Sequence, residues 1–233
     1  MKASLVFTGS LTNVKGDVYN GTHYLEPCYE QIIKHITSPN KDWEIDSYFH
    51  MWSDGTAEEN NIIEKMLELY KPIKAEFTSG LIKNNFISKM KSNWKAFNLI
   101  EKKYDLYIFL RPDIYFNKTL NLSEYNLEDI YHNNGMIEEG GHFGDFYFIM
   151  NEENAKEYVQ IYIENKKLEN EIWSEDKWRH IYIPKIENKL NKLGKIKDDL
   201  KAGSRQEVEV YRKRRKGYKG LIANLKNKIM KYK

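Results

Sequence analysis

Short, strongly apolar runs alternate along the chain with longer stretches in which apolar residues recur every three or four positions. The runs predict strands at residues 3–8, 45–51, 73–77, 104–110 and 144–150. The helical spacing predicts helices at residues 24–36, 58–70, 85–103, 152–165 and 173–183. Strands that alternate with helices predict an α/β fold with a mostly parallel, Rossmann-like sheet flanked by helices.

Three predicted strands end in polar segments, at residues 9–13, 52–55 and 111–115. Ligands bind at the carboxyl ends of the strands in open sheets of this kind, so these segments are candidates for a binding site. Arg111 and Asp113 directly follow the most strand-like segment of the chain. A divalent cation that carries a diphosphate needs one or two carboxylates in such a position. The alternative is an ion pair between Arg111 and Asp113 at the start of a loop.

The composition excludes several classes of protein. Of the 233 residues, 41% are hydrophobic and 30% are charged, which supports a sizeable core and excludes a disordered chain. Cys28 is the single cysteine, so an internal disulfide framework and a cysteine-based zinc cluster are excluded. No apolar run approaches the ~20 residues of a membrane span, and the first run is too short for a signal peptide. We therefore expect a cytoplasmic protein.

The charge is distributed unevenly, which predicts two parts of the chain. Residues 185–233 hold 17 Lys and Arg against 5 Asp and Glu, so their net charge is +12 and residues 1–184 carry −9 of the total of +3. We expect one domain at 1–184 and a basic, helical extension at 185–233. Within 205–233, apolar residues at helical spacing among lysines predict a helix that lies peripherally on an anionic membrane surface. The alternatives are a helix packed on the body and a nucleic-acid arm, but no base-reading module is present and we expect no nucleic-acid partner.

Residues 93–116 (NWKAFNLIEKKYDLYIFLRPDIYF) resemble the central block of glycosyltransferase-like proteins of the WavE lipopolysaccharide-synthesis type. Three further blocks are similar in order and spacing, at residues 8–12, 46–54 and 144–146. The resemblance extends over roughly residues 3–180 and implies a GT-A-like fold. It also implies a glycosyltransferase that uses a nucleotide-sugar donor.

The resemblance implies a role for each polar strand end. Asp113 would take the place of the Asp-x-Asp motif that holds a divalent metal, Mn or Mg, and the donor diphosphate. The third position of that motif is Tyr115 here, so a metal site would have one carboxylate fewer and Arg111 could instead neutralise the diphosphate. The loop after the first strand, with Gly9, Ser10 and Thr12, would approach the nucleotide. Its alternative is an ordinary turn between a strand and a helix.

His50 and Trp52 lie two residues apart in a predicted strand, so both side chains face the same side. They could line the donor pocket, with Trp52 packed on a base or a sugar. The alternative is a core tryptophan beside a buried histidine whose hydrogen bonds are satisfied.

Residues 138–145 (EEGGHFGD) form the richest polar stretch of the body. An inverting transferase needs a carboxylate that deprotonates the acceptor hydroxyl. Asp145 is the first candidate for this base, and Glu139 and Glu138 are the next. His142 could complete a metal shell with Asp113, because neutral imidazole is a common ligand. The alternative is a glycine-rich loop with solvated acids.

Together these features predict a glycosyltransferase that moves a sugar from a nucleotide-sugar onto a glycan or a lipid-linked acceptor. A membrane-facing tail suits an enzyme that modifies lipid-linked acceptors. One competing hypothesis is a non-catalytic nucleotide- or glycan-binding protein that keeps the fold and has lost the chemistry. Another is a nucleic-acid-associated protein that uses the basic tail.

Overall fold

The computed structural model describes residues 1–11, 25–80, 82, 84–116, 118–134, 143–171, 196–198 and 208–210. Its strands are β1 (Lys2–Ser10), β2 (Glu44–Trp52), β3 (Lys74–Thr78), β4 (Leu106–Leu110), β5 (Ile114–Phe116), β6 (Ile130–Asn134), β7 (Phe143–Met150), β8 (Ile196–Asp198) and β9 (Val208–Val210). Its longer helices are α1 (Leu25–Ile32), α2 (Ala57–Tyr70), α3 (Asn85–Asn98) and α4 (Glu152–Asn165). Short helical turns lie at Ile33–Thr37, Ser38–Asn40, Leu122–Glu124 and Lys166–Asn170.

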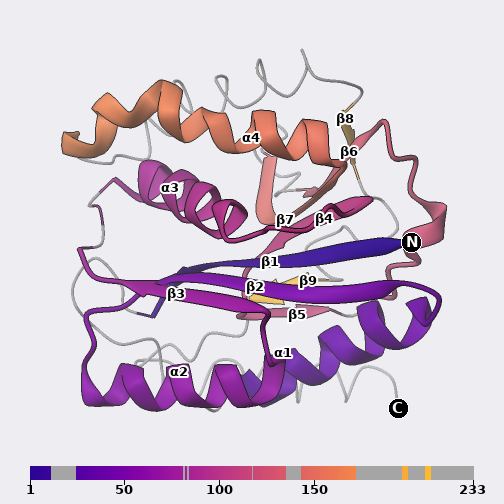
Figure 1. The fold of residues 1–233 in the computed structure, drawn as a ribbon, viewed down its shortest axis with the longest axis horizontal. Coiled ribbons are helices and arrows are strands. Elements are labelled where there is room, and N and C mark those ends of the chain that lie inside the picture. The colour runs from indigo at the N-terminus through magenta and orange to yellow at the C-terminus, as the bar shows by residue number, and fades with distance from the viewer. Residues whose placement is uncertain are drawn as a thin grey trace, which may run out of the picture.

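In the described part of the chain, the main sheet has the strand order β3-β2-β1-β4-β7-β6-β8 (Figure 1). Strands β3, β2, β1 and β4 run parallel, whereas β7 is antiparallel to both β4 and β6. The α/β class and the mostly parallel sheet are confirmed, because four of the six strand pairings are parallel and β7 alone among the described strands of this sheet runs in the opposite direction. Parallel neighbours need a long crossover, which α1, α2 and α3 supply for the first four strands. Between β4 and β7, the only helical segment among the described residues is the turn Leu122–Glu124, which lies between β5 and β6.

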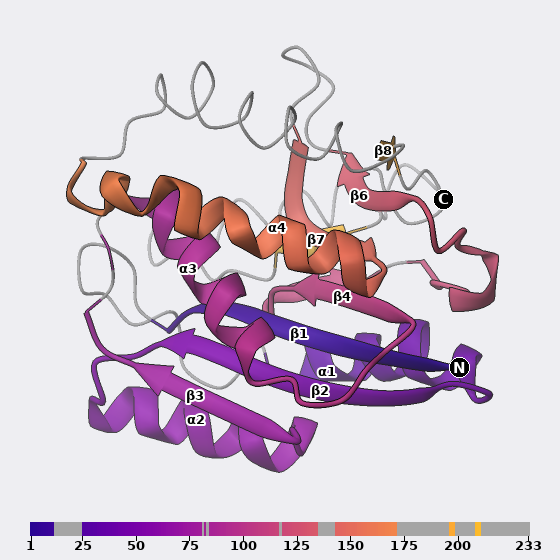
Figure 2. The ribbon, with the colours of Figure 1, turned by 45° about the horizontal axis from the view of Figure 1, so that its top comes forward.

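Helices cover both faces of the sheet, with α1 and α2 on one face and α3 and α4 on the other (Figure 1, Figure 2). On the α1–α2 face, the rings of Phe7 and Phe49 stack with their centroids 4.4 Å apart, and Tyr70 meets both edge-on. Val6 belongs to the core on the α3–α4 face. Because successive residues of a strand point to opposite faces, β1 is buried on both sides, which explains its almost unbroken apolar sequence.

The predicted helices begin at capping residues. Thr56 and Glu59 form a capping box at the start of α2, and the side chains of Asn84 and Asn151 cap α3 and α4. Helix α3 ends at Asn98 and not at residue 103. The next two N–H groups bond to carbonyls three residues back, at 3.2 and 3.1 Å, so the last turn tightens before the chain enters β4.

Two described segments of the basic tail are strands and not parts of a helical extension. β8 runs parallel to β6, and β9 pairs antiparallel to β5, with Val210 opposite Ile114. The amphipathic helix expected near the C-terminus lies outside the described residues, and the boundary at residue 184 stays a prediction. A truncation that tests the tail should begin after Val210, because removing residues 205–233 also removes β9.

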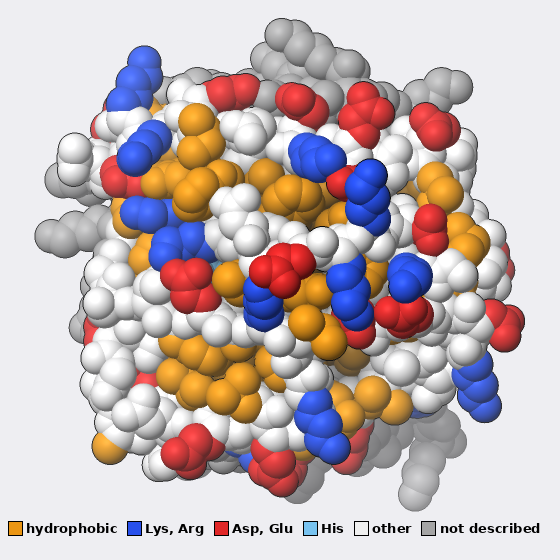
Figure 3. All heavy atoms as spheres, viewed as in Figure 1, with side chains coloured by type: hydrophobic (Ala, Val, Ile, Leu, Met, Phe, Trp, Pro, Cys, Tyr) orange, Lys and Arg blue, Asp and Glu red, His pale blue; other side chains and the backbone are white. Residues whose placement is uncertain are grey.

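Basic and acidic side chains alternate on the face shown in Figure 3. Many form ion pairs, such as Lys95 with Glu76 at 2.6 Å and Lys91 with Glu169 at 3.2 Å. Such mixed surfaces generate no strong field of one sign. Among the described helices, none combines the length and the apolar character that crossing a membrane requires.

Candidate functional site

The order of the strands creates a switch point between β1 and β4. From β1 the chain moves to β2 and β3 on one side, and then returns to place β4 on the other side of β1. The two strands are parallel, with Phe7 opposite Leu110, so their carboxyl ends share one edge of the sheet. Their crossover helices α1 and α3 lie on opposite faces (Figure 2). In open α/β sheets, this arrangement leaves a crevice outside the strand ends, where ligands bind.

Gly9 brings the end of β1 against the turn that follows β4. A Cβ atom at this position would lie 3.2 Å from Cε of Met51 and 3.8 Å from Cδ of Pro112. The missing side chain therefore leaves room for the side chain of Met51, while Pro112 lies at an ordinary van der Waals distance. Ser10 ends β1 opposite Trp52 of β2, whereas Thr12 lies outside the described residues. Two of the three predicted loop residues thus lie at the switch point.

Arg111 and Asp113 form a bidentate ion pair directly after β4. Nε of Arg111 donates to Oδ1 of Asp113 at 2.8 Å, and an Nη atom donates to Oδ2 at 2.6 Å. Both side chains are largely buried, with exposed fractions of 19% and 17%. The structure therefore contains the Arg–Asp pair that sequence analysis held as the alternative.

The described residues do not fit a divalent metal at Asp113. Both of its carboxylate oxygens accept hydrogen bonds from one guanidinium, and the sequence supplies Tyr115 where a second aspartate would stand. Among the described residues, no group of three or more His, Cys, Asp and Glu side chains could hold a metal ion. Burial, with the charge of Asp113 as a second cause, raises the pKa of Cys28 to about 12, so that thiol stays protonated. His142, the other expected ligand, lies outside the described residues.

His50 and Trp52 share a face of β2, as their spacing predicts, but both are buried beneath α3. The hydroxyl of Ser92 donates to the backbone carbonyl of His50 at 3.0 Å, so its oxygen accepts from Nδ1 at 2.8 Å. Nε2 then accepts from the hydroxyl of Thr78 at 2.9 Å. The indole N–H of Trp52 donates to the carbonyl of Ser88 at 3.2 Å. This geometry favours a satisfied core pair over the expected lining of a donor pocket.

Asp145 belongs to β7, whose register places its backbone near the switch point. Tyr147 pairs with Leu110, the last residue of β4, and Asp145 lies two residues earlier in the antiparallel strand. Its backbone therefore extends past the end of β4, toward the edge that holds Arg111. Glu138 and Glu139 lie outside the described residues, so their expected role stays untested.

Two positioning residues near this edge were not predicted. Asn93 of α3 accepts a hydrogen bond from the hydroxyl of Thr8 at 2.7 Å and donates to that of Tyr158 at 2.9 Å. This buried bridge fixes β1 directly before Gly9. Its signal in the sequence is an asparagine that interrupts the apolar face of a predicted helix.

Glu59 fixes the loop that follows β2. Its Oε2 atom accepts from the hydroxyl of Ser53 at 3.2 Å and from the backbone N–H groups of Asp54 and Thr56 at 2.9 and 3.1 Å. The sequence pattern of a capping box, with Thr56 three residues earlier, could have found it.

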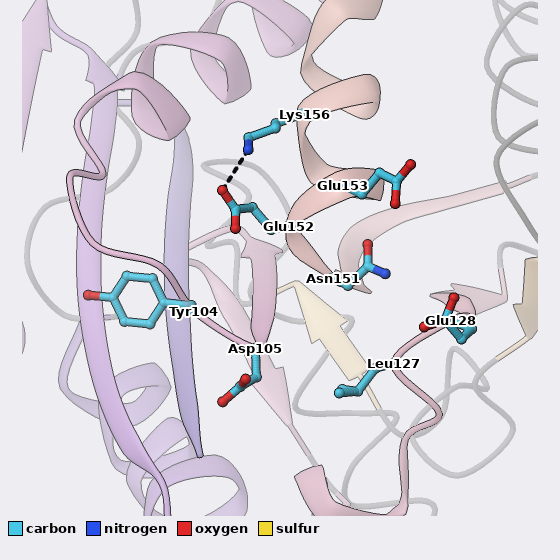
Figure 4. Close-up of a pocket in the computed structure, with 8 residues that line it drawn as sticks. All are labelled: Tyr104, Asp105, Leu127, Glu128, Asn151, Glu152, Glu153 and Lys156. Carbon is cyan, nitrogen blue, oxygen red and sulfur yellow. Dashed lines mark ion pairs between the residues drawn. The ribbon is translucent and has the colours of Figure 1, made fainter.

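A hollow of about 390 Å³ lies at the opposite edge of the sheet (Figure 4). It is lined by Tyr104, Asp105, Leu127, Glu128, Asn151, Glu152, Glu153 and Lys156. Glu152 and Glu153 lie at the start of α4, where they complement the helix dipole, and Glu152 pairs with Lys156 at 2.6 Å. Asp105 accepts a hydrogen bond from the backbone N–H of Lys2 at 2.7 Å. A structural role therefore explains them, and the hollow is remote from the predicted site residues.

Comparison with solved structures finds 180 similar chains. No protein-family model and no curated protein matches the chain. A crystal structure of a glycosyltransferase involved in the glycosylation of the major capsid of PBCV-1 is similar, with 14% identity and a TM-score of 0.42. The match covers 84% of this chain and 81% of that one. At this identity and TM-score, the similarity supports no conclusion about function. It does not confirm the resemblance to the WavE type.

Proposed function

We propose that this protein is a glycosyltransferase that binds the diphosphate of a nucleotide-sugar at the carboxyl edge of β1 and β4. The observation that carries the proposal is the switch point itself. Gly9 at the end of β1 and the guanidinium of Arg111 after β4 lie at the edge where open α/β sheets bind ligands. The guanidinium of Arg111 suits a diphosphate, which offers only acceptor oxygens.

The protein would promote sugar transfer by positioning the donor and the acceptor and by stabilising the charge of the leaving group. The acceptor hydroxyl attacks the anomeric carbon, a new C–O bond forms, and the bond to the diphosphate breaks with its electron pair on the leaving oxygen. Arg111 stabilises the charge that develops on the departing diphosphate. In an inverting reaction, the carboxylate of Asp145 takes the proton of the acceptor hydroxyl. The acceptor is a glycan or a lipid-linked glycan.

A transfer assay tests this proposal. UDP-, GDP-, TDP- and CMP-sugars are incubated with the protein and a mixture of oligosaccharide and glycolipid acceptors, and nucleotide release is measured. We expect acceptor-dependent release from one donor. Asp145→Asn should slow it by about 100-fold or more with unchanged nucleotide affinity.

The matched control is Glu153→Gln, which removes a carboxylate at the opposite edge of the sheet and should leave turnover unchanged. Nucleotide binding without any transfer would contradict the proposal and favour a non-catalytic binding protein. Equal losses in both variants would exclude Asp145 as a specific base.

The basic tail supports a second part of the proposal, an anionic membrane as partner. The run Arg212-Lys213-Arg214-Arg215-Lys216 and the apolar spacing after it suit a surface rich in anionic lipids. We expect co-sedimentation with phosphatidylserine vesicles that disappears when residues 211–233 are removed. The truncation keeps β9, so transfer to a soluble acceptor should persist. Equal sedimentation of both proteins would refute the membrane role.

A further inference from the structure

We propose that Asp113 is an internal competitor for the diphosphate and not a metal ligand, so that the ligand binds Arg111 without a divalent cation. This inference rests on the proposed function, since it concerns the same edge of the sheet. It assigns the positive charge of the site to the guanidinium. It also assigns Asp113 the role of holding that guanidinium until an anion replaces the carboxylate.

The Arg111–Asp113 pair has the same hydrogen-bond geometry that Arg111 would form with a phosphate group. Nε and an Nη atom of Arg111 present two parallel N–H donors, and the two oxygens of Asp113 accept one bond each, at 2.8 and 2.6 Å. Two oxygens of a phosphate group take the same fork of donors. The carboxylate therefore occupies the positions that a phosphate would use, and the two anions exclude each other from this face of the guanidinium.

The charge around Asp113 and the small number of possible ligands oppose a divalent metal at this position. A divalent metal favours several oxygen ligands, whereas each oxygen of Asp113 already accepts a hydrogen bond from a guanidinium whose positive charge would repel the metal. No further cluster of ligating side chains lies among the described residues, and Cys28, close enough to be influenced by Asp113, is a buried thiol. A diphosphate at this edge also meets the negative charge of Asp113, which opposes binding until the pair opens.

The two roles predict opposite effects of one substitution. Removing the charge of a metal ligand weakens diphosphate binding, whereas removing a competitor strengthens it. Asp113→Asn keeps the size of the side chain and abolishes the charge, so it frees the guanidinium and removes the repulsion. We expect about fivefold tighter binding or more, because the ion pair no longer has to open before the guanidinium binds the anion.

Calorimetric titration with pyrophosphate, UDP, GDP and TDP tests the inference, each in EDTA and in Mn²⁺. Wild-type protein should bind pyrophosphate and one nucleotide equally in both buffers, and Asp113→Asn should bind them more tightly. Asp54→Asn is the matched control, because it removes an exposed carboxylate after the neighbouring strand β2 and should change the affinity less than twofold. Asp113→Ala should shift affinity in the same direction, and melting curves without ligand show whether the variants are folded.

Binding that requires Mn²⁺ and is lost in Asp113→Asn would overturn this inference and leave the proposed function standing. The absence of any nucleotide or pyrophosphate binding in wild-type protein, with and without Mn²⁺, would overturn both. A tightening of similar size in Asp54→Asn would show a general charge effect at this edge and would also overturn the competitor role.

Discussion

Replacing Arg111 with alanine is expected to weaken diphosphate binding by about 30-fold or more. Removing one partner of a largely desolvated charged pair costs about 2–5 kcal/mol, because the pair includes two charge-assisted hydrogen bonds. The side chain is only 19% exposed, so little bulk water is at hand to replace it. Titration of wild-type and variant protein with the nucleoside diphosphate that binds the wild type measures the loss.

Two further variants show whether the weaker binding is specific to the guanidinium of Arg111. Arg111→Lys keeps the charge but not the fork of two donors, so it should recover only part of the affinity. Lys74→Ala removes a cation at the start of β3, away from the switch point, together with its ion pair to Glu101, and should leave the affinity unchanged. An Arg111→Ala variant that is folded and binds as tightly as the wild type would remove Arg111 from the site.

The second large effect is a loss of stability in mild acid that is caused by His50. Burial, followed by the charge of Lys95, lowers the pKa of this histidine from its usual 6.5 to about 4. Glu76, which pairs with Lys95, opposes the shift, and Lys91 adds to it. Between pH 6.5 and 4, the unfolded chain therefore binds a proton that the folded protein does not bind. The free energy of unfolding must fall as the pH falls through this window.

The lowered pKa of His50 sets how much the free energy of unfolding falls in acid. At 1.36 kcal/mol per pKa unit, His50 contributes a loss of about 3 kcal/mol between pH 7 and pH 4. Urea unfolding at several pH values measures it. His50→Gln, which does not titrate, should flatten the decline by about this amount, whatever its stability at pH 7.

Ser92→Ala is the control for His50. It removes one hydrogen-bond partner but leaves the imidazole buried, so the decline with pH should persist. A decline that is equally steep in wild-type protein and in His50→Gln would mean that other groups cause it.

The local elements of this fold could be predicted because their signals are local. The apolar run around Phe7 must be a strand buried on both faces, and the capping box at Thr56 marks the start of α2 to within two residues. Strands β5 and β6 were not predicted, and β8 and β9 were missed because each has three residues among charged neighbours. Their pairing with β6 and β5 depends on contacts between residues far apart in the chain, and no periodicity encodes such contacts.

The candidate site could be placed but not resolved from the sequence. Gly9 and Arg111 were predicted at one sheet edge because the ends of parallel strands meet there. The spacing of His50 and Trp52 predicted a shared face correctly, but which helix covers that face depends on the order of the strands. Whether Asp113 faces a metal or a guanidinium depends on side-chain geometry. Asn93 was missed because its partner Thr8 lies 85 residues away.

Hydrogen exchange on the complex with the tightest-binding nucleoside diphosphate shows whether the ligand binds at the ends of β1 and β4. We expect protection of the backbone N–H groups of residues 9–11 and of Arg111, Asp113 and Ile114, at the carboxyl ends of β1 and β4. The amides at residues 127–128 and 151–153, which line the hollow at the opposite edge, should exchange at unchanged rates. Protection confined to that hollow, with none at the ends of β1 and β4, would contradict the account.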